Sequence, residues 1–388
     1  VLGDFEPRFV LRKFTAPQIA KLRDEVFSTY PQAQAIWLSE YVGSEGTQNF
    51  LNAYSNYPVL AGVQTNLYKC FLPQAWNNSS PLGVSGFLHP EGVYDDPRGG
   101  GLRRELYKRL RAHFQFQNER TLFPIGNRNK FSINVFGSYL DQPTFINITN
   151  LFVPHTIDAC FEPAGDRVVG GIKNEADEWN QEGHPDRVLF ITNKDLALFA
   201  QLYDEDGTDP LEARLPALHT IQLLAVLQKF AQQPQRLGDL QGEYTSLEMW
   251  HETNAQNDGT IKRETRFPQD PSQWILSGPH FYVGNPLYKT PREICTEKGH
   301  YDGIDLLTIP DDYLPRTNYL PACSADEYRS RTPKVSWVEE GETEPKRVTE
   351  YYRLVLRKRL SQSGERSMIS SLIPPQVAHV ISAQSAAF

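Results

Sequence analysis

The sequence lacks long apolar runs, and none of its stretches approaches the roughly 20 apolar residues needed to cross a bilayer. Its opening, VLGDFEPRFV, has neither the basic start nor the apolar block of a secretory leader. The 4 cysteines lie far apart with no Cys-x-x-Cys pair, which is typical of reduced thiols rather than of a disulfide framework. These absences predict a cytoplasmic protein that does not span a membrane.

Ligand sets for metal ions are missing as well. The 9 histidines are scattered, and neither His155 with Cys160 nor Cys295 with His300 has a second ligand pair nearby. A structural zinc ion needs four such ligands. The sequence therefore predicts no metal site, and it shows no Ser-His-Asp set or nucleophile elbow.

A metal-dependent nuclease is one alternative function. Its PD…ExK site would combine Asp311 or Asp312 with Glu344 and Lys346, and cleavage would be lost on Glu344→Ala. Pro345 stands between the last two of these residues and would disrupt the strand that such a site needs. This position of the proline argues against the nuclease.

Charge and size set broader limits. The formal net charge of -8 argues against non-specific coating of nucleic acid, but local patches rather than totals set phosphate contacts. A chain of 388 residues is long enough for two or three cores, since domains usually run to about 100–200 residues. The 28 prolines and 26 glycines indicate many loops and short elements.

The first part of the chain has the pattern of half an α/β sheet. A helix is predicted at 15–30 with Thr15 as its N-cap, and another at 65–76 that Pro73 should kink or shorten. The elements that follow are a buried strand at 84–90, a helix at 102–114, and strands at 114–119 and 131–137. Such a half-sheet leaves an exposed edge unless more chain covers it.

The rest of the chain is less regular. A long helix is predicted at 215–232, and residues 240–345 are rich in Pro, Gly, Asp and Thr with short strand-like pieces. A strand is predicted at 351–360, and another apolar segment lies at 367–375. This texture is typical of an irregular, β-rich module.

Arginines cluster on the strand predicted near the C-terminus. Arg353, Arg357 and Arg359 fall on one face at the strand period of two residues, with Arg366 nearby. The other face is mainly apolar, with Tyr352, Leu354, Leu356 and Leu360. Such a strand would place a basic face against DNA phosphates, and the alternative is an ordinary solvated strand face.

Two short motifs have ordinary explanations. Residues 285–288 (NPLY) resemble the Asn-Pro-Pro-aromatic motif that holds an adenine amino group, but Leu287 replaces the second proline and the surroundings are loop-rich. Glycines 99–101 lack the G-x-G-x-x-G spacing of a phosphate loop and are best explained as a flexible lead-in to a helix.

Four polar residues follow the strand predicted at 84–90, where active-site residues of α/β sheets gather. They are His89, Glu91, Asp95 and Asp96. A solvated loop and a functional site are equal alternatives at this position.

Several stretches together resemble one family, the large adenine-N6 DNA methyltransferases of type IIG restriction-modification and of phage-defence systems such as BREX and DISARM. The stretches occur in the family's order, and the ordered set is more specific than any one of them. They are TNLYKCFLPQAW (65–76), GFLHPEGVYDDPRGGGLRRELYKRLRAHFQFQNE (86–119), FSINVFG (131–137), MWHETNAQNDGTIKR (249–263), WILSGPHFYVGNP (274–286) and YRLVLRKRLSQSGERSMISSLIPP (352–375).

This resemblance implies roles for individual residues. S-adenosylmethionine would be the cofactor, and its adenine would lie against an aromatic residue that matches Phe71, with Asn66 nearby. Phe123 matches the residue that stacks on a flipped-out adenine of double-stranded DNA, and Arg128 and Lys130 would meet the DNA backbone. Base flipping is required because the methyl donor cannot reach N6 inside the stacked duplex.

The resemblance also implies an α/β architecture in three parts. Residues 1–145 would be the second half of a Rossmann-like class I methyltransferase sheet, and 146–240 a spacer with the long helix. Residues 241–388 would be an irregular α+β, partial target-recognition domain that reads base edges in the major groove.

Two motifs of the family are missing from the chain. Its glycine-rich cofactor motif and its Asn-Pro-Pro-aromatic motif normally precede the region that matches residue 1, and the chain lacks an initiator Met. We therefore expect a segment of a site-specific methyltransferase that is inactive alone and needs its N-terminal half or other defence-system subunits. The alternative is a non-catalytic DNA-recognition or scaffold subunit of a defence complex.

Overall fold

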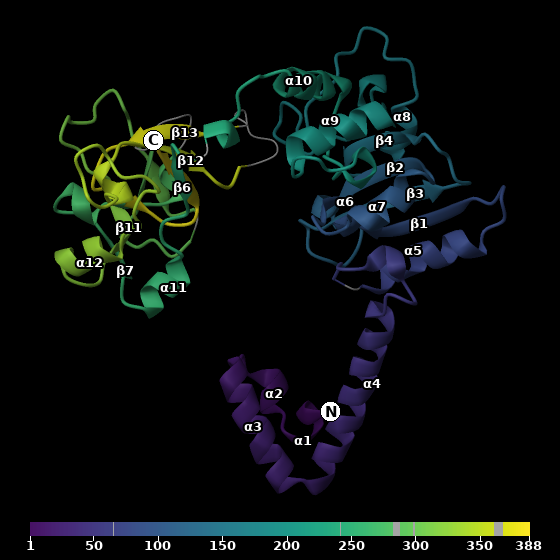
Figure 1. Ribbon diagram of the computed structural model, residues 1–388, viewed down its shortest axis with the longest axis horizontal. Coiled ribbons are helices and arrows are strands. Elements are labelled where there is room, and N and C mark those ends of the chain that lie inside the picture. The colour runs from purple at the N-terminus through teal and green to yellow at the C-terminus, as the bar shows by residue number, and fades with distance from the viewer. Residues whose placement is uncertain (65, 241, 282–287, 298, 361–367) are drawn as a thin grey trace. The chain divides into compact units, whose positions relative to one another are not determined.

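The computed structural model describes residues 1–64, 66–240, 242–281, 288–297, 299–360 and 368–388 (Figure 1). The chain divides into two compact units, Val1–Gln232 and Gln233–Phe388. Both units mix helices with strands, so the fold is mixed α/β. Within the described residues, none of the helices combines the length and the apolar content that a transmembrane span requires.

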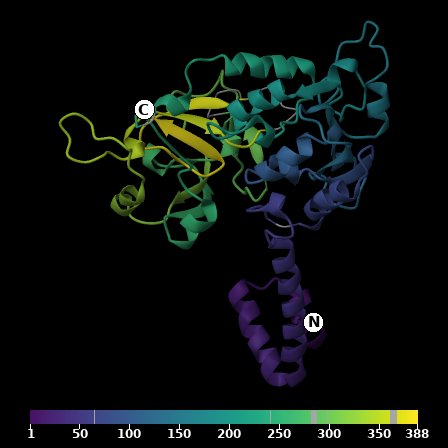
Figure 2. The same ribbon diagram turned by 45° about the vertical axis from the view of Figure 1, so that its right-hand side comes forward.

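The first unit begins with a set of helices, α1 Leu2–Phe5, α2 Arg8–Leu11, α3 Ala16–Thr29 and α4 Pro31–Asn52. A capping box fixes the start of α3, because the Thr15 backbone N–H donates to Gln18 Oε1 at 2.9 Å. Helices α3 and α4 pack as a hairpin (Figure 2), with the Phe27 and Trp37 rings 5.7 Å apart. The helix predicted at 15–30 is confirmed, including Thr15 as its N-cap.

A 5-stranded mixed sheet forms the centre of the first unit. Its strands are β1 Ser85–Pro90, β2 Leu110–Gln117, β3 Lys130–Phe136, β4 Thr144–Leu151 and β5 Leu189–Thr192, in the order β1-β3-β2-β4-β5. Strand β3 runs antiparallel to β1 and β2, β2 and β4 are parallel, and β5 runs antiparallel to β4. The carboxyl ends of β1, β2 and β4 therefore lie at one edge of the sheet.

Helices and short turns pack on this sheet. They are α5 Leu67–Asn78, α6 Gly92–Asp95, α7 Gly100–Tyr107, α8 His155–Ala159, α9 Asn193–Tyr203 and α10 Ile221–Ala231, with 3-10 turns η1 Pro58–Leu60, η2 Asn118–Arg120, η3 Pro185–Arg187 and η4 Pro210–Glu212. The larger core joins α5, α7 and α9 to the sheet through buried side chains such as Leu72, Leu106 and Phe199. A smaller core contains Phe116 and Phe131. Loops at the carboxyl edge thus start from strands that packing holds in place.

Two predicted helices have different bounds in the structure. Pro73 does not shorten α5, which continues to Asn78 because Cys70 and Leu72 on its other turns are buried in the core. The helix predicted at 102–114 ends at Tyr107, since the chain enters the sheet at Leu110, a fully buried residue. The helical sequence pattern continues beyond Tyr107, but burial of the following residues in the sheet ends the helix there.

Two further predictions need correction. The strand predicted as buried at 84–90 is β1, the end strand of the sheet, and its Leu88 is 52% exposed. The helix predicted at 215–232 begins only at Ile221, because Leu215 lies in an extended segment whose N–H donates to the Tyr94 carbonyl at 3.3 Å. By contrast, the strand predicted at 131–137 is confirmed as β3.

The second unit is built from short strands around a 4-stranded antiparallel sheet of order β13-β12-β15-β6. Its elements are η5 Leu237–Leu240, β6 Thr245–Leu247, α11 Glu252–Asn257, β7 Ile261–Arg266, η6 Pro271–Gln273, β8 Ile275–Leu276, η7 Gly278–His280, β9 Lys289–Pro291, β10 Tyr301–Gly303, β11 Thr317–Pro321, α12 Ala325–Arg331, η8 Val348–Glu350, β12 Arg353–Arg357, β13 Ser370–Ile373, β14 Ala378–His379 and β15 Ala383–Ala387. The irregular, β-rich texture predicted for this part is confirmed, and β12 lies within the strand predicted at 351–360.

Candidate functional site at the carboxyl edge of the sheet

The segments that follow β1 and β2 meet at the carboxyl edge of the sheet. Strand β1 leads directly into Glu91 and α6, and β2 leads into η2 and the loop 121–129. The Glu91 backbone N–H donates to the Lys130 carbonyl at 3.3 Å, which ties the two segments together. Functional residues of α/β proteins gather at this kind of edge.

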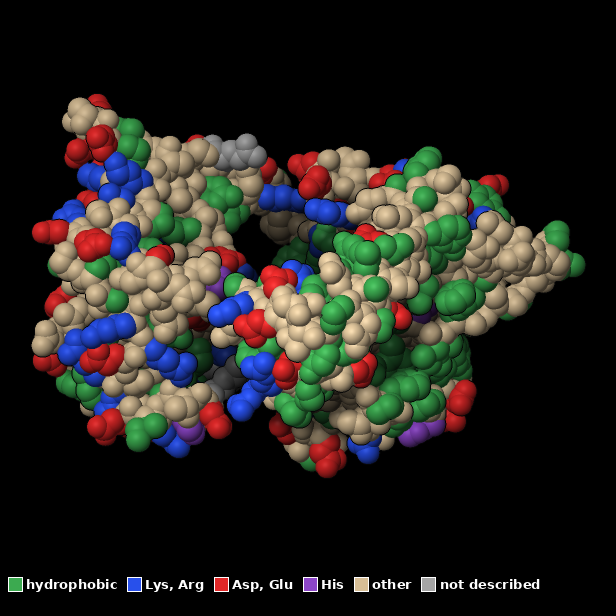
Figure 3. Space-filling view, turned by 90° about the horizontal axis from the view of Figure 1, so that it is seen from below, with side chains coloured by type: hydrophobic (Ala, Val, Ile, Leu, Met, Phe, Trp, Pro, Cys, Tyr) green, Lys and Arg blue, Asp and Glu red, His purple; other side chains and the backbone are tan. Residues whose placement is uncertain are grey.

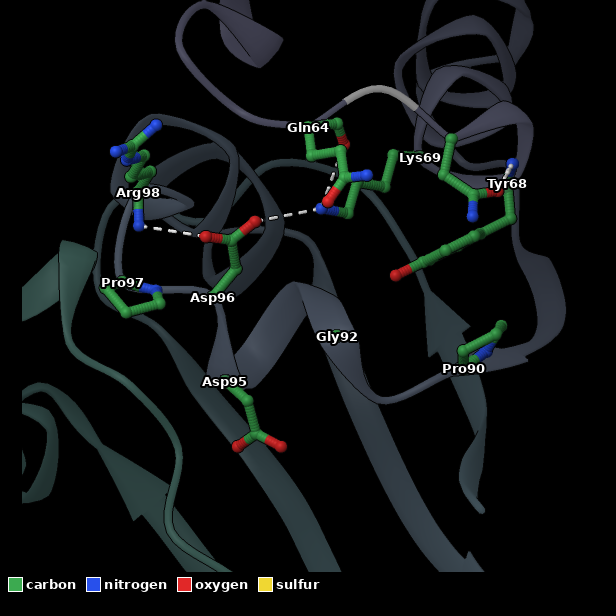
Figure 4. Close-up of a pocket in the computed structure, with 10 residues that line it drawn as sticks. Gln64, Tyr68, Lys69, Pro90, Gly92, Asp95, Asp96, Pro97 and Arg98 are labelled. Atoms are coloured by element: carbon green, nitrogen blue, oxygen red, sulfur yellow. Dashed lines mark hydrogen bonds and ion pairs between the residues drawn. The ribbon is translucent and has the colours of Figure 1, made fainter. Parts of the chain in front are cut away.

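A pocket of about 660 Å³ opens beside the end of β1 (Figure 4). Its lining comes from the start of α5 and from the segment after β1, namely Gln64, Asn66, Tyr68, Lys69, Pro90, Gly92, Asp95, Asp96, Pro97 and Arg98. Lys69 Nζ and Asp96 Oδ2 form an ion pair of 3.0 Å, and Asp96 Oδ1 accepts the Arg98 backbone N–H at 3.0 Å. The ion pair fixes α5 against the loop after β1.

Tyr68 offers both an aromatic face and a phenol to this pocket. Its ring stacks on the buried His89, with 5.3 Å between the ring centroids. Burial, helped by the charges of Glu91 and Asp96, raises the pKa of Tyr68 to about 12. The phenol therefore stays neutral at physiological pH. A β-carbon on Gly92 would lie 3.0 Å from the Tyr68 hydroxyl, so glycine keeps this side of the pocket open.

A buried ion pair lies behind the pocket. Glu91 Oε1 is 3.1 Å from His113 Nε2, and their side chains are only 5% and 1% exposed. Burial alone would raise the pKa of Glu91, but His113 and hydrogen bonds from His113, Ser132 and Gln115 lower it to about 2. Burial likewise opposes the charge on His113, and the Glu91 carboxylate raises the pKa of His113 above its usual value. The pair is therefore charged at mildly acidic pH.

Further polar side chains extend this network across the sheet. The Tyr94 hydroxyl donates to Asn134 Oδ1 at 2.6 Å, and Asn134 Nδ2 donates to His89 Nε2 at 3.0 Å. On the other side of the pair, His113 Nδ1 lies 2.7 Å from Asn147 Oδ1. This network links β1 to β4 across the sheet. Its members are buried, so they position the edge of the sheet.

The four polar residues predicted after β1 divide into two pairs. His89 and Glu91 are buried members of the network, whereas Asp95 and Asp96 line the pocket. Burial, with the charge of Glu91, raises the pKa of Asp95, and the cation of Lys130 opposes that change. The segment is therefore part of the candidate site and is not a purely solvated loop.

Phe123 lies on the loop after β2, at the same edge. Its ring meets Phe131 edge to face at 5.0 Å and is 37% exposed. The fully buried Asn118 accepts the Phe123 N–H on Oδ1 at 3.1 Å and donates from Nδ2 to the Phe123 carbonyl at 3.0 Å. Phe123 is thus held from both sides with part of its ring free. Arg128 is exposed on the same loop, and Lys130 is half-buried where β3 begins.

The two residues predicted to bind the cofactor have different positions. Asn66 caps α5, where its side chain accepts the Tyr68 N–H at 3.4 Å, and it lines the pocket. Phe71 lies on α5 with 60% of its side chain exposed and does not line the pocket. The structure brings Asn66 to the candidate site and leaves Phe71 outside it.

Gly99 and Gly100, at the start of α7, are closely packed and do not form a flexible lead-in. A β-carbon on Gly99 would lie 2.9 Å from Arg103 Nη1, and one on Gly100 would lie 3.0 Å from Glu212 Oε2. Arg103 is 1% exposed and donates to the carbonyls of Asp96 at 2.6 Å and of Glu212 at 2.9 Å. A side chain at Gly99 would displace the buried Arg103 guanidinium, and one at Gly100 would displace the Glu212 carboxylate.

The arginines of the second unit do not form the predicted basic face. Arg353 is fully buried, where Nη2 donates to the Val377 carbonyl and Nη1 lies 3.7 Å from Met249 Sδ, and burial lowers its pKa to about 10. Arg357 is half-buried and donates to the Phe281 carbonyl at 3.3 Å.

The faces of β12 are therefore opposite to the predicted ones. The side that was expected to be basic is buried, as Val355 shows beside Arg353, while Tyr352 is 70% exposed. Arg359 is exposed after β12. Arg366 and the motif residues Asn285, Pro286 and Leu287 lie outside the described residues.

Sequence reasoning missed Tyr68, His113 and Asn118. The sequence contains one signal for the network. Polar residues recur at every second position of β2 and β3, as with His113 and Gln115 or Ser132 and Asn134, which places them on one face of the sheet. Among the described residues, no three His, Cys, Asp or Glu side chains come together as a possible metal site.

The surface charge is mixed. In the view of Figure 3, Lys and Arg side chains alternate with Asp and Glu over the surface. This distribution agrees with the net charge of -8.

No protein-family model matches the sequence, and no curated protein matches it. Among solved structures 26 chains match, and one of them is the crystal structure of the type I restriction enzyme EcoKI M protein. That match has a TM-score of 0.24 and 12% sequence identity, and it covers 43% of this chain and 43% of that chain. This chain thus spans less than half the length of that protein. A TM-score this low identifies neither the fold family nor the function.

Proposed function

We propose that this chain is a segment of a site-specific DNA adenine-N6 methyltransferase of a restriction-modification or phage-defence system. The observation that carries the proposal is the meeting of the pocket and the Phe123 loop at one sheet edge, tied by the bond from Glu91 to Lys130. An enzyme that methylates a base in DNA needs a donor pocket beside a surface that receives the extruded base. The ordered set of sequence stretches that resembles this family supports the same function.

The pocket residues fit part of S-adenosylmethionine. The Tyr68 ring offers a face for a planar purine, and the cations of Lys69 and Arg98 balance the carboxylates of Asp95 and Asp96. A lining without net charge suits a ligand that carries charges of both signs. When bound, S-adenosylmethionine would supply the methyl group. The residues of this chain would bind and orient it.

The remaining contributions of this chain would be contacts to DNA. Phe123 would stack on the extruded adenine, which offsets part of the cost of unstacking it. Arg128 and Lys130 would contact the phosphate backbone and fix the orientation of the duplex. The Asn and Pro acceptors for the amino group would come from outside this chain, and their preorganised geometry would supply most of the catalysis.

The outer strand of the sheet, β1, supports the need for more chain. Within the described residues, β1 pairs only with β3, and no strand lies on its other side. Val84 and Leu88, at and beside this edge, are 73% and 52% exposed. Edges of this kind are aggregation-prone unless another segment covers them. We propose that the front half of the sheet, on the same polypeptide or on a separate subunit, pairs with β1.

The domain limits follow from the same proposal. The expected boundary at residue 145 falls inside β4, so the methyltransferase part would extend through β5 and its helices to Gln232. The unit Gln233–Phe388 would be the partial target-recognition domain. Its surface, rather than Arg353, would then contact DNA.

Reconstitution tests the proposed function. This chain would be combined with the front half of the natural gene product, and transfer of labelled methyl groups to adenine in duplex DNA would be measured. We expect activity only when both parts are present. Phe123→Ala should reduce it by about 5- to 150-fold, since a stacked base is worth about 1–3 kcal/mol. Phe190→Ala removes a ring that is 65% exposed on β5 and should leave activity unchanged. Reconstitution without methylation would overturn the proposal.

One observation favours the alternative of a non-catalytic DNA-recognition or scaffold subunit. Phe71 lies outside the pocket, although the resemblance gives it contact with the cofactor. A recognition subunit would retain DNA binding without using this residue. Isothermal titration of the reconstituted protein with S-adenosylmethionine separates the two functions, because only the methyltransferase should bind it.

A further inference from the structure

The loop 121–129 presents apolar side chains to solvent on a fixed backbone. Leu122 is 40% exposed and Ile125 is 47% exposed, and they flank the partly exposed Phe123. Exposed apolar groups are common singly, but three within four positions on one loop form a local apolar tip. The surrounding contacts show that this tip is built into the fold.

Asn118 organises the loop from beneath. Besides its two bonds to Phe123, its Nδ2 lies 3.0 Å from the Ile125 carbonyl and 3.4 Å from the Gly126 carbonyl. The Asn118 backbone N–H also donates to the Asn129 carbonyl at 3.0 Å, which closes the base of the loop. One buried amide therefore fixes the backbone on both sides of the apolar tip.

Thr121 adds a second sign of a specialised loop. Its φ of 51° and ψ of 45° place it in the left-handed region, which a β-branched residue rarely adopts. Strain of this kind persists where surrounding contacts hold it and is concentrated at functional sites. The strained residue immediately precedes Leu122, at the start of the apolar tip.

Cations precede and follow the tip along the chain. Arg120 and Arg128 are exposed and Lys130 is half-buried, and within the described part of the chain none of the three forms an ion pair. Glu119 is the nearby acidic residue, and it accepts a hydrogen bond from Asn127 Nδ2 at 3.1 Å. The loop thus combines an apolar tip with a net positive base. This combination fits a partner that has a stacked apolar interior behind an anionic surface.

We propose that Leu122 and Ile125 form a wedge that enters the base stack of duplex DNA beside the extruded base. This inference rests on the proposed function and deepens it, because it assigns DNA contacts to residues other than Phe123. Apolar side chains inserted between base steps unstack and kink the duplex, while flanking cations contact the phosphates. A wedge of fixed shape loses little conformational freedom on insertion.

The test compares two DNA duplexes that differ at one position. One duplex is fully paired, and the other has an abasic position that is already unstacked. Fluorescence anisotropy measures binding of the full chain, and 2-aminopurine beside the test position reports unstacking. Leu122→Ser/Ile125→Ser should bind the paired duplex about tenfold more weakly but the abasic duplex less than about threefold more weakly, because unstacking costs a few kcal/mol per step. Its 2-aminopurine signal on the paired duplex should stay low.

A matched control removes exposed apolar side chains outside the loop 121–129. Val168→Ser/Leu307→Ser changes side chains that are 88% and 96% exposed and should bind both duplexes like the unmodified chain. Asn118→Ala leaves the wedge side chains in place but frees the loop, and it should show the same selective loss as the wedge variant. Thermal melting of each variant establishes that it is folded.

The outcomes separate this inference from the proposed function. Equal losses on the two duplexes would overturn the wedge while leaving DNA binding and methylation by the reconstituted enzyme intact. Binding of the unmodified chain to anionic phospholipid vesicles but not to DNA would overturn the wedge in favour of a membrane contact. Failure of the unmodified chain to bind either duplex, together with failed reconstitution, would overturn both proposals.

Discussion

The loop 121–129 of the first unit and strand β12 of the second unit both carry arginine, yet they use it differently. Arg128 is exposed on the loop, whereas Arg353 is fully buried in β12. The loop follows the end of β2 and is exposed to solvent on its outer side. Strand β12 lies between β13 and β15, so one of its faces must form a core. The position of a segment in the fold, and not its charge, decides what its cations do.

The two segments also differ in what holds them. Arg353 is fixed by its own contacts, because its guanidinium donates to the Val377 carbonyl inside the second unit. The loop is fixed by residues that are themselves buried, Asn118 in η2 just before it and Glu91, whose backbone N–H donates to the Lys130 carbonyl just after it. A buried side chain thus serves stability directly in β12, whereas the buried amide of Asn118 holds an exposed surface at the carboxyl edge. Substitutions in each segment should separate these two uses.

The largest effect is expected at Glu91, whose buried carboxylate pairs with His113. Glu91→Gln keeps the shape but leaves His113 without its carboxylate, and breaking a buried pair costs about 3–5 kcal/mol. The pKa of Glu91 is lowered to about 2 and that of His113 is raised. The contribution of Glu91 is therefore lost as pH falls from about 4.5 towards 2, and that of His113 is lost as pH rises above about 6.5.

Urea unfolding of the unmodified chain and of Glu91→Gln across this pH range checks the prediction. The difference in the free energy of unfolding should be largest between about pH 4.5 and 6.5 and smaller on both sides. Glu105→Gln is a matched control, since its partner Arg109 is closer to the surface and the pair is worth much less. A difference that stays constant with pH would show that the charge on the pair does not stabilise the fold.

The next largest effect is expected at Arg353. Arg353→Ala leaves a cavity in the second unit and removes the donor to the Val377 carbonyl, which should lower the free energy of unfolding by about 2–4 kcal/mol. The exposed Arg359 follows the same strand, and Arg359→Ala should change stability by less than about 0.5 kcal/mol. Urea unfolding of both variants measures the difference. Equal stability of the two would mean that Arg353 is not a core residue.

Sequence patterns were sufficient for much of the first unit. The capping residue Thr15 and the alternation in β3 are local signals, and both elements formed where predicted. The end of α7 was not predictable in this way, because its helical pattern continues through residues that enter the sheet at Leu110. Tertiary packing decided the structure there.

The site was predictable only in part. Phe123, Arg128 and Asn66 were identified from local resemblance, and they lie at the carboxyl edge or in its pocket. The residues that support them, Asn118 and His113, were not predicted. His113 contacts Asn147, which is far from it in sequence, and Asn118 contacts backbone carbonyls of an irregular loop. The burial of the two β12 faces was reversed because alternation alone divides the residues between two faces without showing which face is buried.

The smallest effect on stability is expected at Arg128, and its effect should appear in DNA binding. Arg128→Ala removes an exposed cation and should change the free energy of unfolding by less than about 0.5 kcal/mol. If Arg128 contacts a phosphate, the slope of log K against log salt for duplex binding should fall by about 1, equally for all sequences. Arg12→Ala, at an exposed position near the N-terminus, should leave the slope unchanged. An unchanged slope for Arg128→Ala would place the phosphate contacts elsewhere, and the contrast with Arg353 would then reduce to exposure alone.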